Sequence, residues 1–393
     1  TGLVTVSTAV HWSVFGKCVI LLLIQIGGLG FMSVAAIASF VLRRTITLHE
    51  RMVMSAGLNL SDGGGIVRLT RRVLFGTFII EGTGAVLLSC RFVPHYGFPK
   101  GITMGVFHAV SAFCNAGFDL MGTPDDPFQS LIGWAEDPLV NITVMALIVL
   151  GGLGFFVWSD VWDKHSFCRL RLHTKIVLTA TAGLLLFGFG WTLLFEWSNP
   201  ATLGAFDTPH KLLAAAFESV TLRTAGFNTI DLGALTGPSQ AVSCLLMFIG
   251  GSPGSTAGGI KTVTAAVLVL TAISAFCGRT TVSAFGRTIA PRSIMNAVTL
   301  LMAGGVLCLV GACAIAGIED APFHQCLFEA VSAFGTVGVS MGLTPTLSAA
   351  SCVILIVMMY MGRVGVLTLG VAVFMRRREP PRLKYPDADV FIG

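Results

Sequence analysis

The sequence repeats one short element, which reads Val110-Ser-Ala-Phe-Cys-Asn-Ala-Gly117-Phe118 and Val331-Ser-Ala-Phe-Gly-Thr-Val-Gly338-Val339. A third copy, Val220-Thr-Leu-Arg-Thr-Ala-Gly226-Phe227, has one residue fewer, and Thr1-Gly2-Leu3-Val4 matches only the end of the element. The four glycines, Gly2, Gly117, Gly226 and Gly338, lie 115, 109 and 112 residues apart. Such regular spacing predicts four repeated units.

A second glycine-rich marker recurs in step with the first. It reads Ile26-Gly-Gly-Leu-Gly-Phe31, Leu150-Gly-Gly-Leu-Gly-Phe155, Ile249-Gly-Gly-Ser252 and Met361-Gly-Arg-Val-Gly365. We therefore expect each unit to contain a spanning helix, a half-helix, a glycine turn and a second spanning helix with glycines at mid-membrane. Because the first unit begins at its glycine turn, we expect its first helix and most of its half-helix to belong to sequence before Thr1.

The composition indicates a membrane protein. Hydrophobic residues make up 54% of the 393 residues, charged residues make up only 11%, and the mean hydropathy is +0.82. A soluble domain carries about a quarter charged residues, so a soluble enzyme, a disulfide-rich secreted scaffold and a disordered chain are excluded. The ten cysteines include no C-x-x-C pair, which favours buried free thiols over disulfides or a metal site. The expected fold class is an all-α polytopic membrane protein, with four pseudo-symmetric helix–pore-loop–helix repeats around one central pore.

Apolar stretches of about 20 residues predict the membrane-spanning helices. They lie near residues 16–42, 73–93, 138–160, 174–196, 240–276, 293–317 and 346–375. Half-apolar segments near 103–114, 208–223 and 322–335 are too short to span and predict re-entrant helices. The expected organisation is repeat 1 at 1–45, a cytoplasmic loop at 46–72, repeat 2 at 73–163, repeat 3 at 164–278, repeat 4 at 279–378 and a cytoplasmic tail at 379–393.

Basic residues predict the orientation. Eighteen of the 25 lysines and arginines lie in four alternate segments, 43–72, 163–175, 279–292 and 376–384, which the positive-inside rule assigns to the cytoplasm. The opposite side is acidic, with Asp119, Asp125, Asp126, Glu136, Asp137, Glu196, Asp207, Asp231, Glu319 and Asp320. These acids either keep the outer loops soluble or form a negative vestibule that concentrates cations at a pore mouth, and the two roles are compatible.

Half-helices followed by glycine turns predict a pore. Backbone that leaves its helix inside a membrane is tolerated only where it lines water or binds an ion. Glycine accepts positive φ angles without a Cβ clash, so successive carbonyl oxygens can face one axis and replace the hydration shell of a cation. Each half-helix also directs the partly negative end of its dipole toward the cation path. The alternative, that these glycines only serve helix packing, does not account for units repeated in register.

At these residues the chain resembles the superfamily of Trk, Ktr and HKT potassium transporters, and it is most similar to the membrane subunits of bacterial Ktr systems. The resemblance rests on Gly27-Gly-Leu-Gly-Phe31, Gly64-Gly-Ile-Val-Arg-Leu-Thr-Arg-Arg72, Arg223-Thr-Ala-Gly-Phe-Asn228, Gly250-Gly-Ser-Pro-Gly-Ser-Thr-Ala-Gly-Gly-Ile-Lys-Thr262, Lys384-Tyr-Pro386 and Ile392-Gly393. It implies a potassium-binding selectivity filter formed by Thr1, Gly2, Leu3, Asn115, Ala116, Gly117, Thr224, Ala225, Gly226, Thr336, Val337 and Gly338. A serine at the first filter position accompanies sodium selectivity in plant relatives, so Gly2 implies potassium.

Residues 250–262 predict a break in the middle of a long spanning segment, because five glycines and Pro253 disfavour a helix there. A phosphate-binding loop is excluded by Ile260, which stands where that motif requires lysine. A simple kink is the alternative, and Lys261 can extend its side chain to the cytoplasmic side. The resemblance implies a gating loop inside the membrane, formed by Gly250, Gly251, Ser252, Pro253, Gly254, Ser255, Thr256, Ala257, Gly258, Gly259 and Lys261.

Arg363 is the most informative single charge. It lies roughly 18 Å along a helix from the cytoplasmic Arg376, a depth at which an arginine costs about 2.5–3.5 kcal/mol. We therefore expect it to face a wet pore or an acidic partner. The resemblance implies a barrier under the filter, and a structural ion pair is the alternative. Glu218, Arg223 and Glu329 are expected to pair structurally or to tune the field at the filter, and Glu81 to make a helix–helix contact.

The expected function is potassium translocation across the inner membrane of a bacterium. The resemblance implies a homodimer, a cytoplasmic ring of KtrA-type subunits that brings control by ATP or ADP, and dependence on Na⁺. No cofactor in this chain and no nucleic-acid partner are expected, and the arginine-rich segments suit that ring or membrane lipid. A sodium- or proton-coupled secondary transporter is the alternative. The fourfold period and the single clearly broken helix argue against it. An enzyme is not expected, because the His, Cys and acidic residues form no catalytic constellation.

Overall fold

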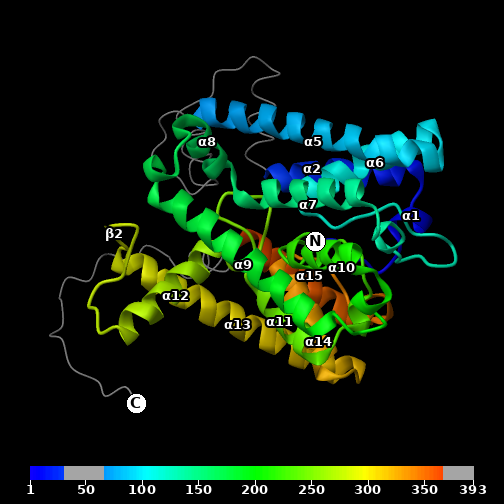
Figure 1. Ribbon diagram of the computed structural model, residues 1–393. Coiled ribbons are helices and arrows are strands. Elements are labelled where there is room, and N and C mark those ends of the chain that lie inside the picture. Colours follow the sequence, from blue (N-terminus) through cyan, green and yellow to red (C-terminus); the bar gives the residue numbers. More distant parts are fainter. Residues whose placement is uncertain (31–65, 366–393) are drawn as a thin grey trace.

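The protein is almost entirely helical. The computed structural model describes residues 1–30 and 66–365 (Figure 1). The helices are α1 (Thr8–His11), α2 (Val14–Leu29), α5 (Ile66–Tyr96), α6 (Phe98–Phe113), α7 (Pro138–Leu153), α8 (Phe155–Lys164), α9 (Leu172–Glu196), α10 (Thr208–Thr221), α11 (Gly237–Phe248), α12 (Thr262–Phe276), α13 (Pro291–Glu319), α14 (Phe323–Gly335) and α15 (Ala349–Val364). Short 3₁₀ turns lie at Ile132–Trp134, Phe167–Arg169, Leu203–Ala205, Leu232–Ala234 and Thr344–Thr346.

Several expectations lie outside the described residues. They are the cytoplasmic tail at 379–393, most of the cytoplasmic loop at 46–72 and the basic side chains of Arg43, Arg44, Arg51, Arg68, Arg376, Arg377, Arg378, Arg382 and Lys384. The orientation expected from the basic segments therefore stays a prediction for these parts of the chain.

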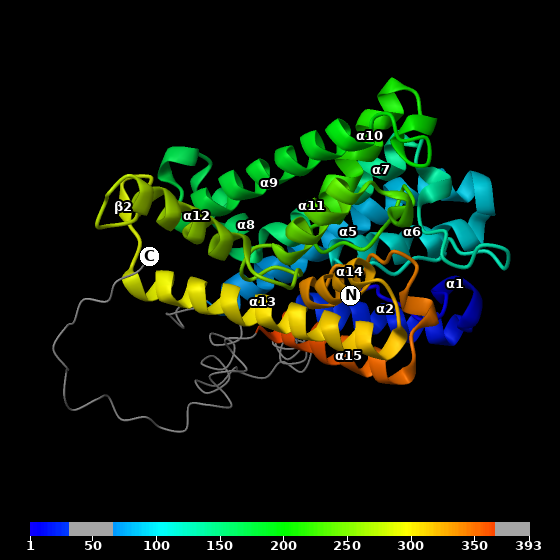
Figure 2. The ribbon, with the colours of Figure 1, turned by 90° about the horizontal axis from the view of Figure 1, so that it is seen from below.

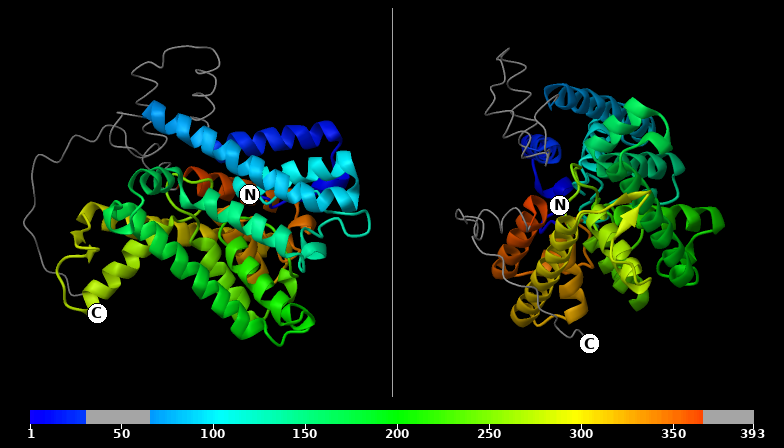
Figure 3. Two further views of the ribbon diagram at one scale, coloured as in Figure 1. Left: turned by 45° about the horizontal axis from the view of Figure 1, so that its top comes forward. Right: turned by 90° about the vertical axis from the view of Figure 1, so that its left-hand side faces the viewer.

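The helices form two groups that meet at the centre of the molecule. α2, α5, α6 and α7 lie together in one group, α9 and α11 to α15 lie in the other, and the N-terminus lies between them (Figures 1 and 3). Each group has its own buried hydrophobic cluster, with Phe92 and Phe113 in the first and Phe328 and Leu355 in the second. Because α10 contributes side chains to both clusters, it joins the two groups.

The three expected re-entrant segments are confirmed as helices. α6, α10 and α14 cover them, and a glycine turn follows each helix. By length and apolar composition, α5, α9 and α13 can each cross a membrane, and the bent pair α7 and α8 makes a fourth candidate. α2, α12 and α15 are apolar but shorter.

The expected single spanning helix at 138–160 is wrong. α7 ends at Leu153, α8 begins at Phe155, and the two helices bend by 91° at the break. Gly154 lies at this break with φ of 94°, which any side chain would strain. α7 starts where the carboxylate of Asp137 accepts the N–H groups of Leu139 (3.0 Å) and Val140 (3.1 Å), a common N-terminal cap.

The other copies of the second glycine marker also end helices. α2 ends before Gly30 (φ 80°) and α15 ends before Gly365 (φ 94°). In the third copy the break is wider, because α11 ends at Phe248 and α12 begins at Thr262. The expected non-helical segment at 250–262 is therefore confirmed to within one residue at each end. The expectation of only one clearly broken helix is wrong, since α7 and α8 supply a second break.

A small hydrophobic cluster lies where α12 and α13 are connected. A two-residue hairpin, β1 (Ser283–Ala284) and β2 (Arg287–Thr288), connects α12 to α13. Val282 and Ile289 beside it pack with Val267 of α12 and Ala297 of α13. Figure 2 shows this hairpin at one end of the molecule, where α12 and α13 meet.

Candidate ion pathway

The four repeated glycines meet in one ring. A Cβ atom built on each glycine would collide with the carbonyl oxygen before the next glycine: Gly2 with Ala116 (2.7 Å), Gly117 with Ala225 (2.9 Å), Gly226 with Val337 (2.6 Å) and Gly338 with Thr1 (1.6 Å). These contacts follow chain order and close on themselves, so the four turns surround a single axis. The glycines have φ angles of 72° to 94°, and only glycine combines that angle with so close an approach.

The glycine turns share their backbone geometry. The residue two positions before the glycine also has a positive φ angle: Asn115 (51°), Thr224 (72°) and Thr336 (55°). The residue between them donates its N–H to the half-helix: Ala116 to Ser111 (2.9 Å), Ala225 to Thr221 (3.0 Å) and Val337 to Ser332 (2.9 Å). The second of these bonds spans one residue fewer than the other two. The shorter turn accounts for the residue that the third copy of the element lacks.

Sequence reasoning missed the side chains that anchor these turns. One hydroxyl on each described half-helix donates to the carbonyl oxygen just beyond the ring glycine: Ser111 to Phe118 (2.7 Å), Thr221 to Phe227 (2.6 Å) and Ser332 to Val339 (2.6 Å). All three hydroxyl-bearing residues are buried. The signal was present in the repeat itself, because serine or threonine follows the valine in each of these three copies.

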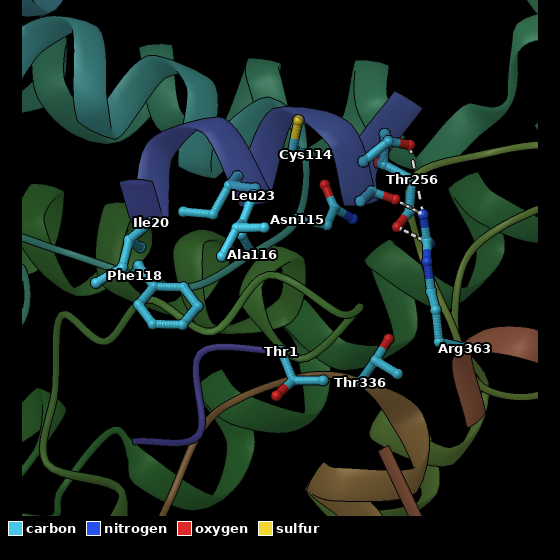
Figure 4. Close-up of a pocket in the computed structure, with 13 residues that line it drawn as sticks. Thr1, Ile20, Leu23, Cys114, Asn115, Ala116, Phe118, Thr256, Thr336 and Arg363 are labelled. Carbon is cyan, nitrogen blue, oxygen red and sulfur yellow. Dashed lines mark hydrogen bonds between the residues drawn. The ribbon is translucent and has the colours of Figure 1, made fainter. Parts of the chain in front are cut away.

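The ring lies between two cavities. The inner cavity has a volume of about 310 Å³, and Thr1, Asn115, Ala116, Thr336 and Arg363 are among the residues that line it. Figure 4 shows Thr1 and Thr336 on one side of this cavity and Asn115 and Ala116 on the other. The outer cavity has a volume of about 390 Å³ and reaches all four ring glycines. Residues just before the ring glycines therefore line one cavity, and the ring glycines themselves line the other.

Two of the ten outer acids line the outer cavity, Asp119 and Asp231. Burial raises the pKa of Asp119 to about 6, although two backbone N–H groups oppose the increase. Other acids have structural roles. Asp137 caps α7, and the carboxylate of Glu319 accepts the N–H of Ser348 (2.9 Å). Fewer acids line this cavity than the sequence offered for a vestibule.

Residues 249–261 form a loop that packs against the inner side of the ring. Its N–H groups donate to carbonyl oxygens of distant helices: Ser252 to Gly152 (3.0 Å), Thr256 to Gly151 (3.3 Å) and Gly259 to Gly362 (3.2 Å). The Thr256 hydroxyl also donates to the carbonyl oxygen of Phe113 (3.1 Å). A Cβ atom on Gly258 would lie 2.2 Å from the Thr336 hydroxyl. The loop is therefore in direct contact with a turn of the ring.

Arg363 connects this loop to the end of α2. Its guanidinium donates to the carbonyl oxygens of Thr256 and Ala257 in the loop and of Gly27 and Gly28 in α2 (Figure 4). No acidic side chain pairs with Arg363 among residues 1–30 and 66–365, so the ion-pair alternative is wrong there. Arg363 also lines the inner cavity.

Lys261 differs from expectation. Its side chain folds back onto the loop, and the ammonium group donates to the Ala257 carbonyl oxygen (2.7 Å). A backbone carbonyl four residues earlier lies within reach of the side chain, so the charge is satisfied inside the loop.

The charged residues on the half-helices do not form the expected ion pairs within the described chain. Arg223 instead donates to the Gly250 carbonyl oxygen (3.0 Å) and to the Thr262 hydroxyl (3.0 Å), at the two ends of the loop. Glu81 of α5 accepts the side-chain amide of Gln25 of α2 (3.0 and 3.1 Å), which is the expected helix–helix contact. Arg223 therefore bonds to a backbone carbonyl group and a hydroxyl group.

Known proteins resemble this chain over its whole length. Residues 1–379 match the TrkH family, described as a cation transport protein. The chain is 40% identical to Ktr system potassium uptake protein B of Bacillus subtilis, over 100% of this chain and 86% of that protein. It is 39% identical to potassium/sodium uptake protein NtpJ of Enterococcus hirae, over 100% of this chain and 87% of that protein. The crystal structure of the potassium transporter TrkH from Vibrio parahaemolyticus shares the fold, with a TM-score of 0.70 at 16% identity over 94% of this chain and 75% of that one.

Proposed function

The chain belongs to the TrkH family of cation transport proteins, and on that premise we propose that its glycine ring is a selectivity filter for K⁺. The protein is a potassium or cation uptake transporter of the Trk/Ktr family, located in the bacterial plasma membrane, and its relatives are transporters rather than enzymes. In the proposed filter, K⁺ exchanges water for carbonyl oxygens contributed by all four repeats.

One observation carries this proposal, the closed ring between two cavities. The carbonyl oxygens of Thr1, Ala116, Ala225 and Val337 each contact the glycine of a neighbouring turn. The cation would pass these oxygens one after another between the outer and the inner cavity. Leu3, Asn115, Thr224 and Thr336 flank the ring and complete the proposed filter. The buried hydroxyl anchors would hold the carbonyls at a spacing that suits a dehydrated K⁺.

We extend the proposal to a gate formed by the loop and Arg363. The loop contacts the ring from the inner side, and the Arg363 guanidinium lies on the inner cavity. A fixed positive charge at that place repels a cation that leaves the filter, most strongly where water is scarce. Opening would require the loop to release the carbonyl oxygens of Gly152 and Gly362, and Arg363 to release the loop.

Regulation and assembly form a further part of the proposal. Relatives named as Ktr system proteins imply a system with more than one component. We propose a cytoplasmic ring of KtrA-type subunits that responds to ATP or ADP, a homodimer of this chain and a role for Na⁺. The repeat boundaries given above, with the proposed gate inside repeat 3, belong to the same proposal.

A sodium- or proton-coupled transporter is the second candidate. Helices interrupted at corresponding places of different repeats are typical of coupled transporters, and both α7–α8 and α11–α12 are interrupted. The two candidates differ in their driving force, since coupled uptake stops when the coupling gradient is removed.

Ion uptake into sealed vesicles tests the proposal. Uptake of K⁺, Rb⁺ and Na⁺ by the full-length protein is compared with uptake by Gly226→Ser and by Gly305→Ser. A Cβ atom at position 226 would lie 2.6 Å from the Val337 carbonyl oxygen, whereas position 305 has no atom within 4 Å. We expect Gly226→Ser to lower the ratio of K⁺ to Na⁺ uptake about tenfold, because the ring must distort, and Gly305→Ser to leave it unchanged. A ratio of K⁺ to Na⁺ uptake that Gly226→Ser leaves unchanged, or uptake that requires a proton gradient, would favour the coupled transporter.

A further inference from the structure

The half-helices carry a second polar residue in register, and sequence reasoning treated two of the three, Glu218 and Glu329, only as charges. His108 on α6 and Glu329 on α14 each lie nine residues before their ring glycine, and Glu218 on α10 lies eight residues before its own. The shorter spacing on α10 again reflects the missing residue of the third turn. All three side chains are buried, with exposed fractions of 0%, 0% and 1%.

His108 holds the segment that leaves its turn. Its Nδ1 lies 2.7 Å from the Met104 carbonyl oxygen, so this nitrogen carries the proton. Nε2 is then an acceptor, and it receives the N–H of Leu120 at 3.3 Å. Leu120 lies three residues beyond Gly117. The histidine thus connects the half-helix to the outer end of the second turn.

Glu329 makes the same connection in the fourth repeat with a different side chain. Its carboxylate accepts the N–H of Met341 (3.1 Å), and Met341 lies three residues beyond Gly338. It also accepts the hydroxyls of Ser340 and of Thr344, the latter at 2.6 Å. Ser340 lines the outer cavity, so Glu329 holds the ring turn and the vestibule wall together.

Glu218 differs from the other two. Neither of its carboxylate oxygens has a hydrogen-bond partner among the residues that the structure describes. The outgoing segment of the third turn is held by the neighbouring repeat instead. The N–H of Asn228 donates to the Ser130 hydroxyl (3.1 Å), and the N–H of Leu131 donates to the Asn228 carbonyl oxygen (2.9 Å).

We propose that Glu329 and His108 are positioning residues for the ion-binding ring, and that Glu218 is not. The turn around each ring glycine of these two repeats is then held at its start by the half-helix and at its end by the N–H three residues beyond the glycine, which donates to His108 or Glu329. The ring carbonyls lie between these two fixed points. This inference rests on the proposed selectivity filter, because it assigns to the two residues a share in choosing the ion.

Leucine substitution distinguishes the role of Glu329 from that of Glu218. Glu329→Leu introduces an apolar side chain of similar size and removes every acceptor that holds the outgoing segment. Glu218→Leu makes the same chemical change at a buried position of the same register, where no hydrogen bond is lost. Glu329→Gln retains one acceptor oxygen and serves as the conservative variant. His108→Phe keeps an aromatic ring beside Phe92 and Phe227 and removes the acceptor of the second repeat.

The measurement is the ratio of initial K⁺ to Na⁺ uptake by full-length protein in vesicles, together with KM for K⁺. For Glu329→Leu we expect a ratio about tenfold lower, the effect of losing a charge-assisted hydrogen bond near the binding group. We expect Glu329→Gln to restore most of the ratio and Glu218→Leu to keep the wild-type ratio. For His108→Phe we expect a fall of about fivefold, since its hydrogen bond is neutral.

The proposal is overturned if Glu329→Leu takes up K⁺ with the wild-type ratio, or if Glu218→Leu lowers the ratio as much as Glu329→Leu does. If Glu329→Leu does not reach the membrane, His108→Phe decides: a lowered ratio supports the proposal and an unchanged ratio overturns it. Failure of the proposed filter gives a different result, because the wild-type protein itself would then show no preference for K⁺.

Discussion

The ring and the loop are both built from glycine, yet they are held in opposite ways. In the ring, the Thr221 hydroxyl bonds to a carbonyl oxygen only six residues away. In the loop, the Thr256 hydroxyl bonds to the carbonyl oxygen of Phe113, 143 residues away. Arg363 reaches the loop from 107 residues away and α2 from more than 330. Each described ring turn is anchored to its own half-helix, whereas the loop is also bonded to other repeats.

This difference shows how one chain can combine a rigid part with a movable one. A bond within one half-helix and its turn survives when whole helices shift, because both partners move together. A bond between distant helices breaks under the same shift. The proposed filter therefore keeps its geometry while the proposed gate responds to any movement of α2, α7 or α15.

The largest effect, a change in initial K⁺ uptake, is expected from Arg363→Ala. It removes donors to carbonyl oxygens of both the loop and α2, so the loop loses its strongest connection to another repeat. Initial K⁺ uptake rises about tenfold, the size expected when charged hydrogen bonds that favour the closed state are lost. The ratio of K⁺ to Na⁺ uptake stays that of the wild type.

Arg363→Lys is the matched variant. It keeps the charge but not the planar guanidinium that reaches several carbonyl oxygens. Its initial K⁺ uptake is expected to lie between that of the wild type and that of Arg363→Ala. Unchanged uptake and unchanged regulation in Arg363→Ala would remove this residue from the gate.

A smaller effect, on the ion ratio and not on total uptake, is expected from Thr221→Val. This change deletes the buried hydroxyl that holds the Phe227 carbonyl oxygen at 2.6 Å. The ratio of K⁺ to Na⁺ uptake falls about fivefold, as for the loss of one neutral hydrogen bond, without a rise in total uptake. Thr221→Ser keeps the hydroxyl and the wild-type ratio. A rise in uptake with an intact ratio would mean that this anchor belongs to the gate.

The smallest effect is expected from Thr256→Val, which makes the same substitution in the loop. It deletes one of several bonds between the loop and its surroundings, so initial K⁺ uptake rises only about threefold. The ion ratio is unchanged, and Thr256→Ser behaves as the wild type. If Thr221→Val and Thr256→Val altered the same property, the distinction between the ring and the loop would not hold.

Much of the fold and part of the site follow from the sequence. The period of the glycine element located all four residues of the ring, and it also contained Ser111, Thr221 and Ser332, which sequence reasoning did not use. Buried free thiols were expected, and all ten cysteines are free, but five are exposed rather than buried: Cys18, Cys90, Cys168, Cys277 and Cys313. The break at Gly154 was missed because an apolar run of that length is typical of a straight spanning helix. The ion pair given as the alternative for Arg363 and the pairing expected for Arg223 are not seen among the described residues, because their partners are backbone carbonyl groups and a hydroxyl.

The sequence by itself determined the membrane class, the repeat and the half-helices, because composition, period and the length of an apolar run are properties of neighbouring residues. Only the tertiary structure decided which carbonyl oxygens meet Arg363, which helices hold the loop, and that Glu329 is bonded while Glu218 is not. Every residue carries the same carbonyl group, so no side-chain pattern marks the one that will accept a bond. Distance in space selects it, and that distance is set by the packing of helices that lie far apart in the chain.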